Sequence, residues 1–420
     1  GRVSYNPNTP PENWEADFEE RFGADAAPYI MAALHKAGDI LPRIVAYCYP
    51  YHQFPMTRGW VEMERQEDVP RYSKALPSDT AQFQGPDEAA RNHLAGTASA
   101  KISPQESHEW FQKIADDVLA LVAEAERRIG DARSNEFEST IADLKILAGL
   151  ARYHSHRAIS GYNYALFRHS NDVHALNDAI VAEQQAIGAW RGIVEAAGDL
   201  YTDNLRMGYC PAGLCGHWRD TLDQLEKGIE ELKKKRDAFK MPDDAGRPVI
   251  AHVPVRKAPP DRPIEIRATV AAEDDIESVI VRYSRKGSSM KREMKRTSPL
   301  TWRTVIPGSL EGGTIAYSIS ARTASGKQVR IPENEGESIS AAITNDNQPP
   351  LIAHMPVARA PAAKPLTIRA TVTDPSGVQW VRLRYRSVTQ FEDYQTLEME
   401  KVGGSSEYVA TVPGDHINPM

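Results

Sequence analysis

The chain has 420 residues, of which 41% are hydrophobic and 25% charged, and its net charge is −7. This length predicts about two to four domains, and the ordinary composition excludes a wholly disordered chain. No apolar run approaches the roughly 18–20 residues of a membrane helix. Residues 1–247 contain 28 basic and 38 acidic side chains, and residues 248–420 contain 22 and 19. Neither half therefore has the concentrated basic surface of a nucleic-acid-binding protein, and we expect no nucleic-acid partner and no membrane span.

Residues 24–241 have the hydrophobic periodicity of α-helices. An apolar stripe from Asp25 to Leu41 predicts a first helix, which we expect Pro42 to end. Ser103-Pro-Gln-Glu106 places a serine at the cap, proline in the first turn and glutamate three residues on, which predicts the start of a second helix. Gly130 is expected to stop that helix.

Three further helices are predicted at 135–168, 172–201 and 217–239. Apolar residues of the helix at 172–201 recur at alternating steps of four and three, which is typical of helices packed nearly antiparallel in a bundle. Short connections after the second and third helices favour antiparallel neighbours. The sequence therefore predicts a bundle of four or five helices.

A long segment at residues 48–102 interrupts this bundle with weak periodicity, many turn residues and several aromatic side chains. Such a loop is typically functional or forms an extended cover. Tyr51, His52, Arg58 and Trp60 combine aromatic faces, which stack on sugar rings, with polar groups that bind hydroxyls. These four are our candidate substrate-binding residues. The alternative is that the loop is ordinary cover for one end of the bundle.

Two polar residues fall on or near the apolar stripes of the long helices. His154 lies close to the stripe of 135–168, and Glu183 interrupts the stripe of 172–201. We expect them to form a buried structural polar pair that fixes the register of the two helices. A catalytic or metal-binding role is the alternative. His156 does not join His154 on one metal, because the two side chains point about 200° apart around the helix.

The chain has three cysteines, too few for a disulfide scaffold. Cys210 and Cys215 are close enough in sequence to form a small-loop disulfide, and free thiols are the alternative. A zinc site would need more ligands than His217, the one histidine nearby, so we expect no metal. We also expect no cofactor. Cys48 is left over.

A linker at 242–247 precedes a domain that is written twice. Pro248-Val-Ile-Ala-His-Val-Pro254 recurs as Pro350-Leu-Ile-Ala-His-Met-Pro356, 102 residues later. The strands alternate apolar and polar residues, and turn residues separate them. We expect two tandem immunoglobulin-like or fibronectin-like β-sandwiches at 248–345 and 346–420, without the cysteine and tryptophan pattern of antibody domains.

The second copy is expected to be incomplete. Trp302-Arg-Thr-Val-Ile-Pro307 is followed by two more strand-like runs, whereas its counterpart, Tyr408-Val-Ala-Thr-Val-Pro413, is followed by seven residues. A sandwich without its last two strands exposes an unpaired edge. We therefore expect this chain to be a piece of a longer protein.

A family resemblance adds to this interpretation. Gly1-Arg-Val-Ser-Tyr-Asn-Pro7 and Trp14-Glu-Ala-Asp-Phe-Glu-Glu-Arg-Phe-Gly23 resemble the segment that leaves the catalytic TIM barrel in large bacterial glycoside hydrolases. Ala37-Gly-Asp-Ile-Leu-Pro42 and the helices after it are similar to the helical domain that follows the barrel in hexosaminidase-like and α-glucuronidase-like families. The tandem sandwiches are similar to the β-modules of such secreted enzymes.

This resemblance implies that residues 1–23 leave an upstream catalytic domain of the same polypeptide. It also implies an extracellular or periplasmic location and a polysaccharide or oligosaccharide ligand. We expect the chain to be the C-terminal accessory region of a glycoside hydrolase, which helps to shape the substrate cleft. The two catalytic carboxyl groups that glycoside hydrolysis requires are expected outside this chain, because it has no βα repeats.

Two alternatives come from other classes of protein. The first is a stand-alone carbohydrate-binding or cell-surface attachment protein with a helical head on an immunoglobulin-like stalk. The second is a catalytic helical bundle that acts through His154, Glu183 or the loop at Cys210.

Overall fold

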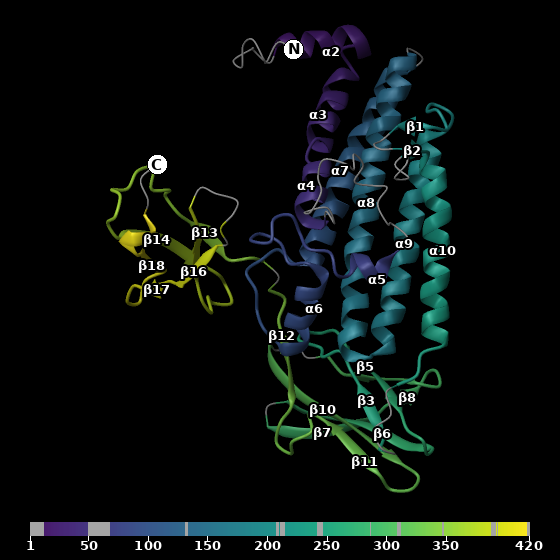
Figure 1. The fold of residues 1–420 in the computed structure, drawn as a ribbon, viewed down its shortest axis with the longest axis vertical. Coiled ribbons are helices and arrows are strands. Elements are labelled where there is room, and N and C mark those ends of the chain that lie inside the picture. Colours follow the sequence, from purple (N-terminus) through teal and green to yellow (C-terminus); the bar gives the residue numbers. More distant parts are fainter. Residues whose placement is uncertain are drawn as a thin grey trace. The chain divides into compact units, whose positions relative to one another are not determined.

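The computed structural model describes residues 12–48, 68–130, 133–206, 210, 215–241, 247–285, 287–308, 312–346, 348–387, 392 and 394–417. The chain divides into two compact units. The first comprises residues 1–256, 263–307 and 314–341, and the second comprises 257–262, 308–313 and 342–420. A helical region precedes a β-rich region with several sheets (Figure 1). The predicted order, helices first and β-structure second, is therefore confirmed.

The first unit is built on long helices that lie side by side (Figure 1). After α2 (Glu12–Phe22) come α3 (Ala27–Ala37), α4 (Ile40–Cys48), α7 (Pro104–Ile129), α8 (Asn135–Ser170), α9 (Val173–Ala197) and α10 (Trp218–Asp237). The predicted start at Ser103 is confirmed, because its hydroxyl accepts the Glu106 N–H at 3.2 Å and the Glu106 carboxylate accepts the Ser103 N–H at 2.8 Å. No described helix is long and apolar enough to cross a bilayer.

The predicted apolar stripes of α8 and α9 form the centre of the bundle core. Trp190 and Tyr153 meet there edge to face, with ring centroids 4.9 Å apart. The buried residues of these stripes include Ile141, Leu144, Ala148, Ala151, Ala158, Tyr162, Leu176, Ile180, Ile187 and Ala197. The bundle prediction is thus confirmed for these helices.

Two details of the helical prediction are wrong. The expected helix at 25–41 is two helices, because α3 ends before Gly38 and α4 begins at Ile40. Pro42 lies in the first turn of α4, where its missing N–H removes no helical hydrogen bond. The segment 48–102 also contains α5 (Val69–Tyr72) and α6 (Pro86–Ala95), which are too short to produce a clear periodicity.

The first β-repeat forms two sheets. One has the order β3 (Val249–Ala251), β5 (Ile264–Ala271), β9 (Thr301–Ile306) and β8 (Lys295–Arg296). In the other, β10 (Gly313–Thr323) pairs with β6 (Ile276–Arg285) and β11 (Gln328–Ile331), and β12 (Ile339–Ile343) adjoins β10. The edge strand β7 (Ser288–Glu293) pairs with β6 and is exposed throughout.

The second β-repeat reproduces this strand pairing. Its larger sheet has the order β13 (Leu351–Ala353), β14 (Leu366–Thr373), β18 (Glu407–Val412) and β17 (Glu400–Lys401), and β15 (Arg382–Tyr385) pairs with β16 (Gln395–Glu398). Ile352 faces Val372 as Ile250 faces Val270. The second unit also contains β4 (Lys257–Ala258), paired with the end of β12, and a short 3₁₀ helix, η2 (Gly414–His416). The repeat predicted from the sequence is therefore confirmed at the level of backbone register.

Candidate functional site

A buried carboxylate joins the end of the bundle to the first β-repeat. Asp172 caps α9, and its Oδ1 accepts the N–H of His174 at 3.0 Å and the hydroxyl of Thr269 at 2.7 Å. Its Oδ2 accepts the N–H of Val253 at 3.0 Å. Asp172 is 2% exposed, so these donors replace the water that an ionised carboxylate loses on burial. One side chain therefore completes both a helix cap and a contact between a helix and a sheet.

Two further contacts strengthen the same place, where β3 and β5 lie at the end of α8 and α9 (Figure 1). The Thr269 hydroxyl accepts the N–H of Val173 at 2.8 Å. Arg267 donates two hydrogen bonds, of 2.9 and 2.5 Å, to the carboxylate of Asp178, which raises the pKa of the guanidinium. We call the set Asp172, Asp178, Val253, Arg267 and Thr269 the helix-end joint.

A histidine fixes the sheet side of the helix-end joint. His252 Nδ1 donates to the backbone oxygen of Arg267 at 2.6 Å, so its Nε2 accepts the hydroxyl of Tyr317 at 2.8 Å. The Tyr317 oxygen in turn accepts the N–H of Val255 at 2.8 Å. This chain of bonds uses the neutral imidazole, and burial lowers the pKa of His252 to about 4.

The short helix α6 makes a second contact with the same segment. His93 Nε2 donates to the backbone oxygen of Pro254 at 2.8 Å, and burial lowers the pKa of His93. Arg256 donates to the backbone oxygens of His93 and Leu94 at the end of α6, at 3.1 and 2.5 Å. Gly96 follows with φ of 71°, and a Cβ there would meet the Arg256 guanidinium at 3.2 Å. A cation thus caps the helix carbonyls where only glycine fits easily.

A shallow cavity of about 520 Å³ lies beside the joint, lined by His174, Glu265, Arg267, Thr297 and Arg303. Its cations are already paired, since Arg267 binds Asp178 and Arg303 lies 3.6 Å from Glu265. Burial lowers the pKa of His174. Both arginines of this cavity therefore already have acidic partners.

The predicted structural residues His154 and Glu183 are both buried, at 2% and 1% exposure. The structure gives Glu183 an ion pair with Arg157, which is fully buried and which the sequence reasoning did not consider. Burial raises the pKa of Glu183, and burial lowers that of His154 to about 3. Arg157 follows His154 by three residues on α8, and this spacing on one helix face is the signal that could have revealed it.

Arg157, Glu183 and His154 are between 0% and 2% exposed, so this group lies inside the core. The ion pair joins α8 to α9, and breaking it would leave an uncompensated buried charge. The burial of Glu183 and His154 favours the structural role over the catalytic alternative.

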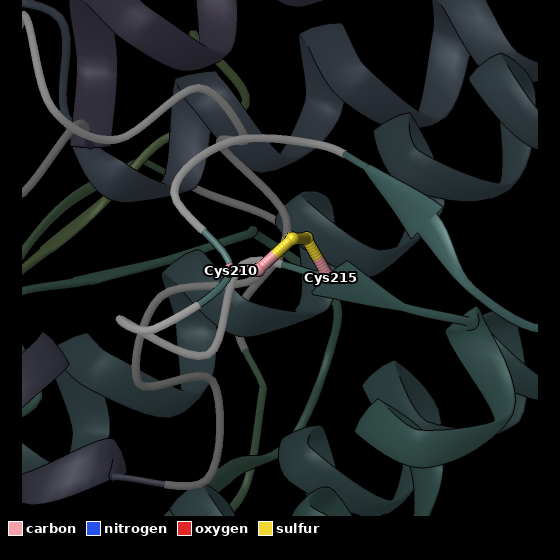
Figure 2. Close-up of a disulfide and its surroundings, with 2 residues drawn as sticks. All are labelled: Cys210 and Cys215. Atoms are coloured by element: carbon pink, nitrogen blue, oxygen red, sulfur yellow. A yellow bond between two sulfur atoms is a disulfide. The ribbon is translucent and has the colours of Figure 1, made fainter.

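Cys210 and Cys215 form a disulfide, with Cα atoms 4.9 Å apart (Figure 2). The disulfide closes a loop between β1 (Leu205–Arg206) and β2 (Cys215–Gly216), which pair antiparallel. Of the two states left open by the sequence, a disulfide or free thiols, the structure has the disulfide. This loop precedes α10, whose Asp220 carboxylate accepts the N–H of His217 at 2.8 Å.

The predicted substrate-binding residues Tyr51, His52, Arg58 and Trp60 lie outside the described residues. Two aromatic residues from the later part of the same segment, Tyr72 and Phe83, are buried against the bundle at 9% and 1% exposure. The Arg43 guanidinium stacks between Phe83 and Trp110, at 4.5 and 4.8 Å from the ring centroids. This later part therefore packs as cover for the bundle.

A groove of the bundle, about 460 Å³, is lined mostly by residues of α8 and α9, among them Gly149, Gly188 and Gly192. Two cations on its rim are already paired, Lys145 with Glu126 at 2.8 Å and Arg152 with Asp116 at 2.8 Å. Its lining contains no aromatic side chain within the described part of the chain. The groove thus lacks the ring platform that sugar binding typically uses.

Across the described ranges, no group of three or more His, Cys, Asp or Glu side chains lies close enough to hold a metal ion. No protein-family model matches the chain, and no curated protein sequence matches it. Its function is therefore inferred from the residues and their geometry.

Proposed function

We propose that this chain is a non-catalytic accessory region of a secreted, polysaccharide-degrading glycoside hydrolase. In this proposal the helical bundle is a rigid support for an upstream catalytic domain, and its segment at residues 48–67 contributes to the substrate cleft. The two β-repeats are immunoglobulin-like or fibronectin-like modules that follow the support.

The helix-end joint is the observation that carries the supporting role. A carboxylate that is 2% exposed and accepts three hydrogen bonds joins the start of a helix to a β-sheet. Flexible connections between domains have exposed, polar linkers instead. The charged residues of greatest burial in the described chain, including Arg157 and Glu183, serve packing in the same way.

Two further observations support the compartment and the modules. Disulfides persist mainly in secreted and periplasmic proteins, and Cys210 is bonded to Cys215. The antiparallel pairing repeated in the two β-repeats suits small β-sandwich modules, which secreted enzymes carry in tandem.

The first experiment isolates the protein from its native cells with an antibody against the bundle, and measures intact mass and hydrolysis of a polysaccharide panel. We expect a species heavier than 46.6 kDa that hydrolyses a polysaccharide. A 46.6 kDa species without hydrolysis would contradict the proposal. If that species bound insoluble polysaccharide, it would be a stand-alone binding protein.

The second experiment tests the cleft residues by co-sedimenting the chain with the polysaccharide so identified. We expect Trp60→Ala to weaken binding about tenfold, since stacking of one aromatic ring is worth roughly 1–2 kcal/mol. Trp110→Ala, which removes one of the two aromatic partners of the half-buried Arg43, is the control and should leave binding unchanged. Equal binding by Trp60→Ala and the unmodified chain would remove the cleft role.

A further inference from the structure

The second β-repeat exposes the strand face with which the first β-repeat binds the end of α9. In the first repeat, the N–H of Val253 and the hydroxyl of Thr269 hold the Asp172 carboxylate. The sequence offset of 102 residues places Met355 and Thr371 at the corresponding positions. The second repeat thus has the same two donor groups.

The local backbone structure of the two faces agrees. Ala251 pairs with Thr269 in the first repeat, and Ala353 pairs with Thr371 in the second. His354 Nδ1 bonds to the backbone oxygen of Arg369 at 2.8 Å, as His252 bonds to that of Arg267 at 2.6 Å. The two donors of the second repeat are therefore held by the same strand pairing and the same histidine contact.

The two faces differ in what covers them. Thr269 is 0% exposed, whereas Thr371 is exposed. Leu351 lies on the same sheet face as Thr371, because it pairs with Thr373 as Ala353 pairs with Thr371, and it is 72% exposed. The segment after β13 adds two further exposed apolar side chains, Met355 at 86% and Val357 at 47%. Exposed apolar side chains beside polar groups are typical of a protein-binding surface.

We propose that this face, the open helix-end receptor (Leu351, Met355, Val357, Arg369 and Thr371), binds the N-terminal end of an α-helix capped by an aspartate in a partner domain. The carboxylate of that aspartate accepts the Met355 N–H and the Thr371 hydroxyl, and the apolar side chains cover the first turns of the helix. The first repeat and α9 show what such a partner looks like, because they make the same contact within one chain.

The charged residues of the receptor indicate which charges the partner helix carries. Arg369 binds Glu407 at 2.9 Å, and an acidic residue at the position of Asp178 in α9 would share this guanidinium. The counterpart of Arg256 is Ala358, so the receptor lacks the cation that caps the carbonyls of α6. The partner therefore presents a helix N-terminus with acidic residues. It does not need a second helix whose C-terminal end, like that of α6, would be capped by a cation of the receptor.

The test uses a stapled helical peptide of residues 170–190 as the probe, with the staple between positions 181 and 185, which are exposed in α9. Binding to the full chain is measured by fluorescence anisotropy. The receptor of the first repeat is occupied by α9 itself, so we expect saturable binding at the second repeat. The Asp172→Asn peptide should bind about tenfold more weakly, because it loses charge-assisted hydrogen bonds.

Variants of the chain locate the binding. Met355→Asp and Thr371→Val, both at exposed positions, should each weaken binding about tenfold or more. Val305→Asp changes an exposed apolar residue of the first repeat and should leave binding unchanged. Unchanged thermal unfolding of each variant confirms that its fold is intact.

Two results would overturn the proposal. One is the absence of saturable binding, or equal binding by the Met355→Asp chain. The other is self-association of the unmodified chain in sedimentation that Met355→Asp abolishes, since a second copy would then be the occupant of the face.

Discussion

The two β-repeats have the same strand register, and the same face is buried in the first and exposed in the second. Ile250 and Ile352 occupy equivalent positions in their sheets. Thr269 is sealed by the bundle, whereas Thr371 is exposed. In the first repeat the Thr269 hydroxyl donates to Asp172, the N-cap residue of α9, which lies outside the repeat. A repeated sequence thus predicts a repeated local structure, while the neighbouring element decides what the repeated face does.

The largest loss of stability is expected when the contact of the bundle with the first repeat is removed at Asp172. Asp172→Ala leaves the N–H groups of His174 and Val253 without their acceptor in a buried place. We expect a loss of about 4 kcal/mol in the free energy of unfolding, measured by urea denaturation. Ser134→Ala, which removes only the cap of α8, is the control and should cost about 1 kcal/mol. Equal losses would show that Asp172 acts as a cap alone.

The pH dependence of stability should also separate the two repeats. Burial lowers the pKa of His252 from 6.5 to about 4, so the unfolded chain binds the proton more tightly than the folded chain. The stability from neutral His252 is therefore complete above pH 6.5 and is lost as the pH falls to about 4, by roughly 3 kcal/mol. His252→Gln should remove this part of the acid loss in urea titrations at pH 7 and pH 4.

The matched variant in the second repeat is His354→Gln, which removes the equivalent bond to the backbone oxygen of Arg369 at an exposed position. His154 adds to the loss in every variant, because burial lowers its pKa to about 3. An acid loss that is equally reduced by both substitutions would contradict the distinction between the two repeats.

A pair of isosteric substitutions compares the hydroxyl groups directly. Thr269→Val removes the donor to Asp172 and the acceptor of the Val173 N–H, so it should cost about 2 kcal/mol. Thr371→Val at the exposed counterpart should change stability by less than about 0.5 kcal/mol. Thermal unfolding of both variants measures the difference, and similar unfolding temperatures would contradict it.

The smallest loss of stability is expected for substitutions of the equivalent arginines, Arg267 and Arg369. Arg267→Ala breaks a two-bond contact with Asp178 in which both side chains are partly exposed, so about 1 kcal/mol is expected. Arg369→Ala breaks the more exposed pair with Glu407 and should cost less than about 0.5 kcal/mol. Chemical denaturation of both variants checks the order, and a larger loss for Arg369→Ala would reverse it.

Patterns of neighbouring residues were sufficient to predict much of this fold. The capping box at Ser103 and the stripes of α8 and α9 follow from residues within a few turns of each other. The repeat follows from a fixed offset, which the strand registers confirm. Short helices such as α5 and α6 escaped because tertiary contacts, rather than periodicity, hold them.

The helix-end joint could not be predicted in the same way. Asp172 is recognisable as a helix start, but its acceptor role toward Val253 and Thr269 joins positions 81 and 97 residues away. The ion pair of Arg157 with Glu183 depends likewise on how two helices face each other. No local pattern contains either contact, although the polar interruption of the stripe at Glu183 showed that a partner was required.

Hydrogen exchange of the matched segments 249–256 and 351–358, read by mass spectrometry, tests most directly whether the bundle end closes one copy of this face and leaves the other open. We predict that the first segment, anchored by the Val253 N–H on Asp172, exchanges at least about a hundredfold more slowly than the second. Asp172→Ala should accelerate the first segment alone. Equal exchange of the two segments in the unmodified chain would contradict the account.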